Sequence, residues 1–228
     1  MRFLAIALMF LLGASAAAAP AARPAAPATD WLTVIVRTPE GFRIGNPDAP
    51  VKLVEYGSRS CPTCGRFARE SGALRSRYVA GGKLSFEFRE FPVHPQDVAI
   101  STLGMCVTPR NFFTILDKMY AGQDAFNARA GALGDARWQQ LQAMPLPQSS
   151  RAIADALGYT ALLKQAGMTE ARIQQCFGDI AALKAFGDRI QAAANIGVNG
   201  TPTFFLNGRR LDAVSWGQIE PELQAAGA

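Results

Sequence analysis

Val51-Lys52-Leu53-Val54-Glu55-Tyr56-Gly57-Ser58-Arg59-Ser60-Cys61-Pro62-Thr63-Cys64 is the stretch of sequence that decides the fold. Residues 51–56 form a mostly apolar run that is typical of a buried strand, and residues 57–60 form a short loop. The pattern over residues 62–78 predicts a helix that begins inside the Cys-Pro-Thr-Cys motif. Two thiols three positions apart on the first turn of a helix can close a disulfide with each other.

The two cysteines of this motif have different expected reactivities. Cys61 lies where the unpaired N–H groups and the dipole of the helix stabilise an anion, and Arg59 adds a positive charge nearby. We therefore expect Cys61 to ionise more readily than Cys64 and to act as a nucleophile. The sequence predicts a protein that exchanges disulfides with other proteins.

The bulk composition limits the class of protein. The chain has 228 residues, of which 49% are hydrophobic and 18% charged, so it can bury a sizeable core and is neither disordered nor a multi-span membrane protein. Its net charge is +5, and the basic residues form no run and do not alternate with aromatic residues. Nucleic acid is therefore not an expected partner.

The N-terminal residues predict export. Arg2 precedes an apolar run from Phe3 to Leu12, and small residues follow to Ala19, so we interpret residues 1–19 as a secretory signal peptide that is cleaved. An uncleaved membrane anchor is the alternative interpretation. Residues 20–30 read as a leader rich in proline and alanine. Export to the periplasm would place the four cysteines where disulfides persist.

Further strands and helices follow the motif. Residues 83–91 alternate apolar with polar, which predicts a strand parallel to residues 51–56 in a βαβ unit. Residues 203–211 read as a hairpin with an Asn-Gly turn, and a helix follows over residues 215–225. Other predicted elements are a strand in 32–37, turns over 45–50, and helices over 97–108, 112–120, 169–177 and 180–195, with one more ending near Gly158 and capped by Ser149 or Ser150.

The order βαβ, helices, ββα with Cys-x-x-Cys at a helix start resembles the thioredoxin fold. The helical insertion resembles the DsbA-like thiol:disulfide oxidoreductases. Three strings support this branch of the family: Gly-Asn-Pro-Asp-Ala-Pro-Val at 45–51, Phe-Arg-Glu-Phe-Pro-Val-His-Pro at 88–95, and Gly-Val-Asn-Gly-Thr-Pro-Thr-Phe at 197–204. The resemblance covers about residues 45–226. It implies an α/β fold with a thioredoxin-like domain in residues 31–96 and 186–228 and a helical insertion in residues 97–185.

The resemblance also implies roles for individual residues. Cys61 would be the exposed attacking sulfur and Cys64 the buried resolving thiol. Thr201 and Pro202 match the substrate-binding loop with its cis-proline, for which an ordinary trans turn is the alternative. Glu55 matches a buried acid that exchanges a proton with Cys64, although Glu55 could instead face solvent.

The remaining cysteines and the single histidine have more modest expected roles. Cys106 and Cys176 are seventy positions apart on predicted helices, and the resemblance implies that they could form a structural disulfide; two buried free thiols are the alternative. We expect His94 to fix its loop through a hydrogen bond. Thr63 stands where DsbA-type oxidases often have histidine, which implies a weaker oxidant.

These observations predict an enzyme, a periplasmic protein-disulfide oxidoreductase that needs no organic cofactor and no metal. Its expected substrates are unfolded or reduced exported proteins, and the resemblance implies a DsbB-like membrane protein that reoxidises it. An isomerase or reductase kept reduced by a DsbD-like partner is the alternative of the same fold. From another class, a metal-handling protein would bind copper or zinc through Cys61 and Cys64.

Overall fold

The structure is a computed structural model that describes residues 29–228. The expected signal peptide (1–19) and all but the last two residues of the expected leader (20–30) lie outside the described residues. Within the described part of the chain, no helix is long and apolar enough to cross a membrane.

A six-stranded sheet lies at the centre, in the order β1-β2-β4-β3-β5-β6. The strands are β1 (Ile35–Arg37), β2 (Phe42–Gly45), β3 (Val51–Gly57), β4 (Leu84–Glu90), β5 (Thr203–Leu206) and β6 (Arg209–Arg210). Strands β3 and β4 are parallel, and every other neighbouring pair is antiparallel. The predicted βαβ unit and the predicted C-terminal hairpin are therefore both present.

Most of the remaining described residues are helical. The α-helices are α1 (Pro62–Glu70), α2 (Asp97–Met105), α3 (Phe112–Ala121), α4 (Gln123–Ala132), α5 (Gly134–Gln142), α6 (Leu146–Leu157), α7 (Tyr159–Gln165), α8 (Glu170–Gly178), α9 (Ile180–Asn195) and α10 (Trp216–Ala225). Short 3₁₀ turns occupy Trp31–Thr33 and Pro109–Asn111, and a wider π-helical segment, η2, spans Leu74–Val79.

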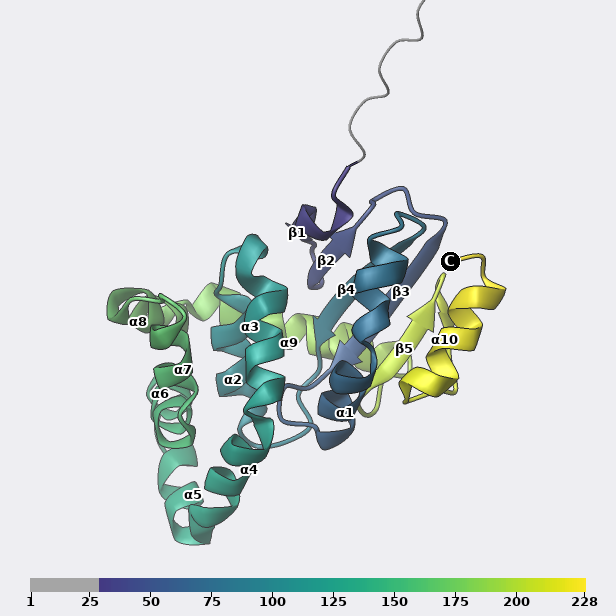
Figure 1. The fold of residues 1–228 in the computed structure, drawn as a ribbon. Helices are drawn as coiled ribbons and strands as arrows, with labels where there is room; N and C mark the ends of the chain where they lie inside the picture. The colour runs from purple at the N-terminus through teal and green to yellow at the C-terminus, as the bar shows by residue number, and fades with distance from the viewer. Residues whose placement is uncertain (1–28) are drawn as a thin grey trace, which may run out of the picture.

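Successive side chains of β3 point to opposite faces of the sheet, and different helices cover the two faces. On one face, α1 and α10 cover the sheet, and the ring of Phe67 from α1 lies 4.6 Å from that of Phe204 in β5. On the other face, α9 packs through Ala193 against a cluster that contains Tyr56 and Val198 (Figure 1). Glu55 lies on the α1 face, where it lines a cavity with Phe67.

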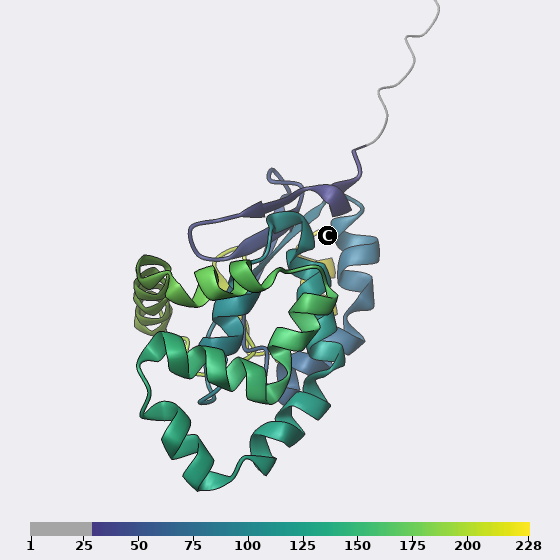
Figure 2. The same cartoon turned by 90° about the vertical axis from the view of Figure 1, so that its left-hand side faces the viewer.

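Helices α2 to α8 pack on one another beside the sheet, and Figure 2 shows them from the side, coloured teal to green. Cys106, directly after α2, and Cys176, in α8, form a disulfide with their Cα atoms 6.0 Å apart. In the structure these two residues are therefore joined, as the resemblance implied. The expected boundary between residues 185 and 186 falls inside the continuous helix α9, and the division into domains stays a prediction.

The α/β thioredoxin-like fold with inserted helices is confirmed, but several expected elements differ. The helix expected over 62–78 is interrupted at Ser71, and the chain continues through Gly72 into the π-helical segment η2. Strand β2 and helices α4, α5 and α7 were not expected. Ser149 and Ser150 are not caps: they lie buried inside α6, which begins directly after Pro145.

The side chain of Arg59 lies close to Gly104 in α2, so a substitution at Gly104 tests how tightly α2 packs. A Cβ atom at Gly104 would overlap the buried guanidinium of Arg59, whereas a Cβ atom at Gly131 in α4 would meet no atom within 4 Å. We expect Gly104→Ala to lower the free energy of unfolding by about 1–3 kcal/mol through overpacking. Gly131→Ala should leave it unchanged or raise it by up to about 1 kcal/mol, because alanine favours helices. Urea unfolding of both variants measures this, and an equal effect of the two would contradict the packing.

Candidate active site

The Ser58–Ser60 loop carries the chain from the end of β3 to the start of α1. Cys61 is the N-cap residue of α1 and Pro62 begins the helix, where its missing N–H costs no hydrogen bond. The amide of Cys61 donates to Oγ of Ser58 at 3.1 Å, and its carbonyl accepts from the amide of Gly65 at 3.0 Å. The sulfur of Cys61 is thereby held at the positive end of α1.

Cys61 lies against the loop that precedes β5. Its Sγ is 3.3 Å from the carbonyl oxygen of Thr201, and the peptide bond between Thr201 and Pro202 is cis. The pKa of Cys61 is lowered to about 5, mainly because the thiol of Cys64 donates a hydrogen bond to its sulfur. Thr201 and the amides of Cys64 and Thr63 lower this pKa further, against the opposing effect of burial.

Cys64 has the opposite electrostatic environment. It lies one turn into α1 with no exposed surface, and both cysteines of the motif are free thiols in the structure. Burial raises the pKa of Cys64 well above its usual value, and its hydrogen bond to Cys61 and the charge of Glu55 raise it further. At neutral pH the pair therefore holds one thiolate, on Cys61, and one proton, on Cys64.

Two expectations about Cys61 were wrong. Its exposed fraction is only 6%, and the Thr201 loop lies directly against its sulfur. Arg59 does not stabilise its thiolate. The guanidinium of Arg59 turns into the core, where its Nη2 lies 2.6 Å from a carboxylate oxygen of Glu90.

Glu55 is buried, as expected, with 3% of its surface exposed. It lies opposite Phe88 of β4 and Phe204 of β5 in the ladder. Burial raises the pKa of Glu55 to about 8, and the charges of Cys61 and Glu90 add to the shift. A cavity of about 30 Å³ beside Glu55 has room for water, which could carry protons to and from this carboxyl.

Asp97 organises the loop in front of Cys61, although nothing in the sequence pointed to it. Its carboxylate is fully buried at the start of α2. It accepts hydrogen bonds from Oγ of Ser58 at 2.8 Å and from Oγ of Ser60 at 2.5 Å. It also accepts from the amides of Val93 and His94, at 2.8 and 2.9 Å. Because Ser58 in turn accepts from the amide of Cys61, Asp97 positions the nucleophile.

Helix α4 contacts the same loop from another side. Nε2 of Gln123 donates to the carbonyls of Arg59 and Cys61, each at 3.0 Å. Nδ2 of Asn127 donates to the carbonyl of Ser60 at 2.9 Å. Gln123 and Asn127 are one turn apart, a spacing that marks one helix face but gives no sign of what that face contacts.

His94 has the structural role expected of it. Its Nδ1 lies 2.9 Å from Oγ of Ser60, so the ring fixes the loop beside the motif. Among residues 29–228, no group of three or more His, Cys, Asp or Glu side chains is arranged to hold a metal ion.

The fold and this site together define a thioredoxin-like protein with an added helical block and a Cys-x-x-Cys motif facing a cis-proline. A family model described as thioredoxin matches residues 37–225. The chain therefore belongs to the thioredoxin family.

Solved structures with the same architecture support this assignment. A protein-disulfide isomerase from Novosphingobium aromaticivorans is 27% identical, with a TM-score of 0.77, over 82% of this chain and 97% of that one. The alpha-DsbA1 of Wolbachia pipientis is 19% identical, with a TM-score of 0.62, over 87% of this chain and 94% of that one. The expected DsbA-like resemblance is confirmed.

Curated relatives include much longer proteins. The Na(+)/H(+) antiporter NhaA 1 of Mycobacterium sp. (strain KMS) is 29% identical over 197 residues, which cover 80% of this chain. The chain spans about 27% of the length of that relative.

The pKa of Cys61 predicts how the reduced protein reacts with iodoacetamide. Only the thiolate is alkylated, so the rate should reach half its maximum near pH 5 and stay nearly constant from pH 7 to 9. Cys64 should remain unmodified in the folded protein because it is buried. Peptide mass analysis after timed alkylation distinguishes the two sites. A midpoint above pH 8 for Cys61 would contradict the proposed environment.

The hydrogen bonds of Asp97 predict a large cost for its isosteric replacement. Asp97→Asn places an NH₂ group where the carboxylate accepts hydrogen bonds from four donors, so buried donors lose their acceptor. We expect the free energy of unfolding to fall by about 3 kcal/mol. Asp135→Asn, at an exposed position in α5, is the matched control and should change it by less than about 0.5 kcal/mol. Similar urea midpoints for the two variants would refute the role of Asp97.

Proposed function

We propose that this chain is a DsbA-like thiol:disulfide oxidoreductase that introduces disulfides into exported proteins through Cys61-Pro62-Thr63-Cys64. The observation that carries the proposal is the contrast between the two thiols. The pKa of Cys61 is lowered to about 5 and that of Cys64 is raised. A lowered pKa stabilises the dithiol form and makes Cys61 a good leaving group, and both effects favour oxidation of the substrate.

The reaction begins with the oxidised enzyme. A substrate thiolate attacks Sγ of Cys61, the Cys61–Cys64 bond breaks, and a mixed disulfide forms between the substrate and Cys61. The electron pair of the broken bond stays on the sulfur of Cys64. The raised pKa of Glu55, to about 8, keeps a proton at this carboxyl near neutral pH, so Glu55 supplies the proton that Cys64 takes up.

A second substrate thiolate completes the reaction. It attacks the substrate sulfur of the mixed disulfide and releases Cys61 as a thiolate. The substrate has then lost two electrons and gained one disulfide. The enzyme has gained these two electrons, and its Cys61–Cys64 pair is in the dithiol form. A DsbB-like membrane protein is the proposed reoxidant, and an organic cofactor is not required.

The Thr201 loop is the proposed site for the substrate backbone. The carbonyl of Thr201 lies 3.3 Å from Sγ of Cys61. An extended substrate segment that pairs with the main chain of Thr201 beside Pro202 would therefore place its cysteine next to Cys61. Main-chain pairing depends little on side chains, which suits reduced, unfolded exported proteins as substrates. We place this reaction in the periplasm, on the strength of the N-terminal residues 1–19.

A disulfide isomerase or reductase is the second candidate function. The likeness to the Novosphingobium aromaticivorans protein-disulfide isomerase favours it, at 27% identity. Such an enzyme would be kept reduced by a DsbD-like partner. The pKa of Cys61, about 5, lies between about 3.5 for the cysteine of DsbA and about 7 for that of thioredoxin.

Oxidative refolding tests the proposal. The oxidised protein should accelerate disulfide formation in a reduced, unfolded substrate, and Cys61→Ser should abolish the acceleration because no internal disulfide can form. The Cys106→Ala, Cys176→Ala double variant is the matched control: it also removes one disulfide and should keep at least half of the rate. Equal rates for Cys61→Ser and the native protein would exclude the oxidase.

The reduction potential separates the proposed oxidase from a reductase. We expect a value between about −120 mV, typical of DsbA, and about −180 mV, typical of protein disulfide isomerase. Equilibration with glutathione buffers measures it. A value near about −270 mV would assign the protein to the reductases.

A further inference from the structure

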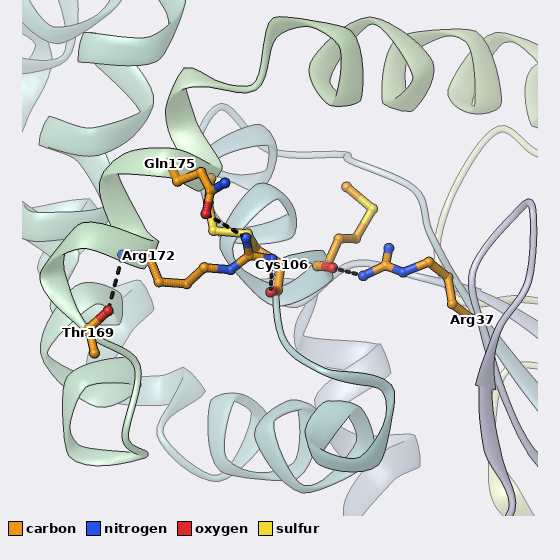
Figure 3. The surroundings of a disulfide bond; sticks show 7 residues. Arg37, Cys106, Thr169, Arg172 and Gln175 are labelled. Carbon is orange, nitrogen blue, oxygen red and sulfur yellow. Dashed lines mark hydrogen bonds between the residues drawn. A yellow bond between two sulfur atoms is a disulfide. The ribbon is translucent and has the colours of Figure 1, made fainter.

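A second polar site lies around the Cys106–Cys176 disulfide, outside the Cys-Pro-Thr-Cys motif. Two cavities flank this disulfide, of about 560 and about 240 Å³. Arg37, Cys106 and Arg172 line both cavities. Figure 3 shows Arg37 and Arg172 approaching Cys106 from opposite sides.

Both arginines are held in place by the main chain at the end of α2. Arg37, the last residue of β1, donates through Nη2 to the carbonyl of Met105. Arg172, in α8, donates through Nη2 to the carbonyl of Cys106 at 3.1 Å and through Nη1 to Oε1 of Gln175 at 2.8 Å (Figure 3). The two guanidinium groups are therefore fixed on adjacent carbonyls, although they come from distant parts of the sequence.

A third arginine joins them from another helix. Nη2 of Arg189, in α9, lies 3.5 Å from the sulfur of Met105, and Arg189 lines the smaller cavity. Burial lowers the pKa of Arg37, and the charges of Arg189 and Arg172 lower it further. We call Arg37, Arg172 and Arg189 the arginine cluster.

Among the described residues, no carboxylate is paired directly with the cluster, although the charges of Glu90, Glu40 and Asp188 act on Arg189 from a greater distance. Within residues 29–228, no carboxylate lies within 4.0 Å of any of the three guanidinium groups. Residues 1–28 contain no aspartate and no glutamate that could supply one. Asp179 lines the smaller cavity, but its Oδ1 accepts from the amide of Ala182 at the start of α9. The C-terminal end of α2 offers about half a negative charge to three positive ones.

The larger cavity combines this charge with apolar walls. Arg37 and Arg172 are exposed, so a ligand can reach them from solvent. The apolar part of the cavity wall is formed by Val107, Ile115, Leu163 and Met168. A guanidinium presents parallel N–H groups that match the two oxygens of a carboxylate or phosphate. An apolar wall favours a hydrocarbon group on the same molecule.

We propose that the larger cavity binds a small organic anion whose charged head pairs with Arg37 and Arg172 and whose apolar body packs on the wall of the cavity. The ligand class is an amphipathic carboxylate or phosphate ester. This site is separate from the Cys61 motif, because the two are lined by different residues, and it does not depend on the proposed enzymatic function.

Calorimetric titration with sodium octanoate tests the proposal on the full chain. We expect binding at one site per chain that is at least tenfold tighter than that of 1-octanol, which has the same chain length and no charge, and at least tenfold tighter than that of inorganic phosphate. The affinity for octanoate should fall as sodium chloride increases. Equal affinity for octanol would overturn the role of the arginines, and equal affinity for phosphate would overturn the role of the apolar wall.

Substitutions locate the site. Arg172→Gln and Arg37→Gln should each weaken octanoate binding at least tenfold, because each removes one guanidinium that pairs with the carboxylate of octanoate. Arg137→Gln, which removes an exposed arginine without an ion pair from α5, is the matched control and should bind as the native protein does. If one variant fails to fold, the other and the salt dependence of the native protein still decide. Equal affinities for Arg172→Gln, Arg37→Gln and Arg137→Gln would refute the proposal.

Discussion

The buried carboxylate of Asp97 is the constraint on which the geometry of the site depends. A carboxylate without exposed surface has lost its hydration, and that loss is offset only when several donors replace the water. Here the donors come from Ser58, Ser60 and the segment after β4. The loop before Cys61 therefore cannot relax without leaving Asp97 unsatisfied, and the helical block, which contributes Asp97, becomes part of the site.

The same rigidity explains how two thiols three positions apart acquire opposite properties. Cys61 caps α1 and receives hydrogen bonds from neighbouring donors, whereas Cys64 is enclosed by the core one turn later. Since the pKa of Cys61 falls from 9.0 to about 5, its thiolate stabilises the folded dithiol form above pH 9, and this contribution is lost as the pH falls through about 5. The disulfide form has no such contribution, so the folded protein favours the dithiol form over the disulfide form.

Local sequence patterns were sufficient for the elements around the motif and insufficient for the contacts behind it. The apolar run of β3, the Cys-Pro-Thr-Cys helix start and the Asn-Gly hairpin each carry a short-range signal. Strand β2 has only four residues and becomes a strand because β4 pairs with it. Arg59 was expected near Cys61, but it turns toward Glu90, 31 positions later, because a buried guanidinium needs a carboxylate partner. Asp97 and Gln123 depend on the packing of helices and gave no recognisable pattern.

Arg59 and the arginine cluster show two outcomes for the same side chain. Arg59 is fully buried, and a carboxylate 2.6 Å away offsets the cost of its desolvation. Arg37 and Arg172 keep access to water, so they can remain without an acidic partner at little cost in the free energy of folding. Their positions are nevertheless fixed by main-chain carbonyls. Less side-chain conformational entropy is therefore lost when a ligand binds to them. The two guanidinium groups are fixed, hydrated and without an acidic partner, and they lie beside an apolar wall. This arrangement suits the binding of an anion and is not required for folding.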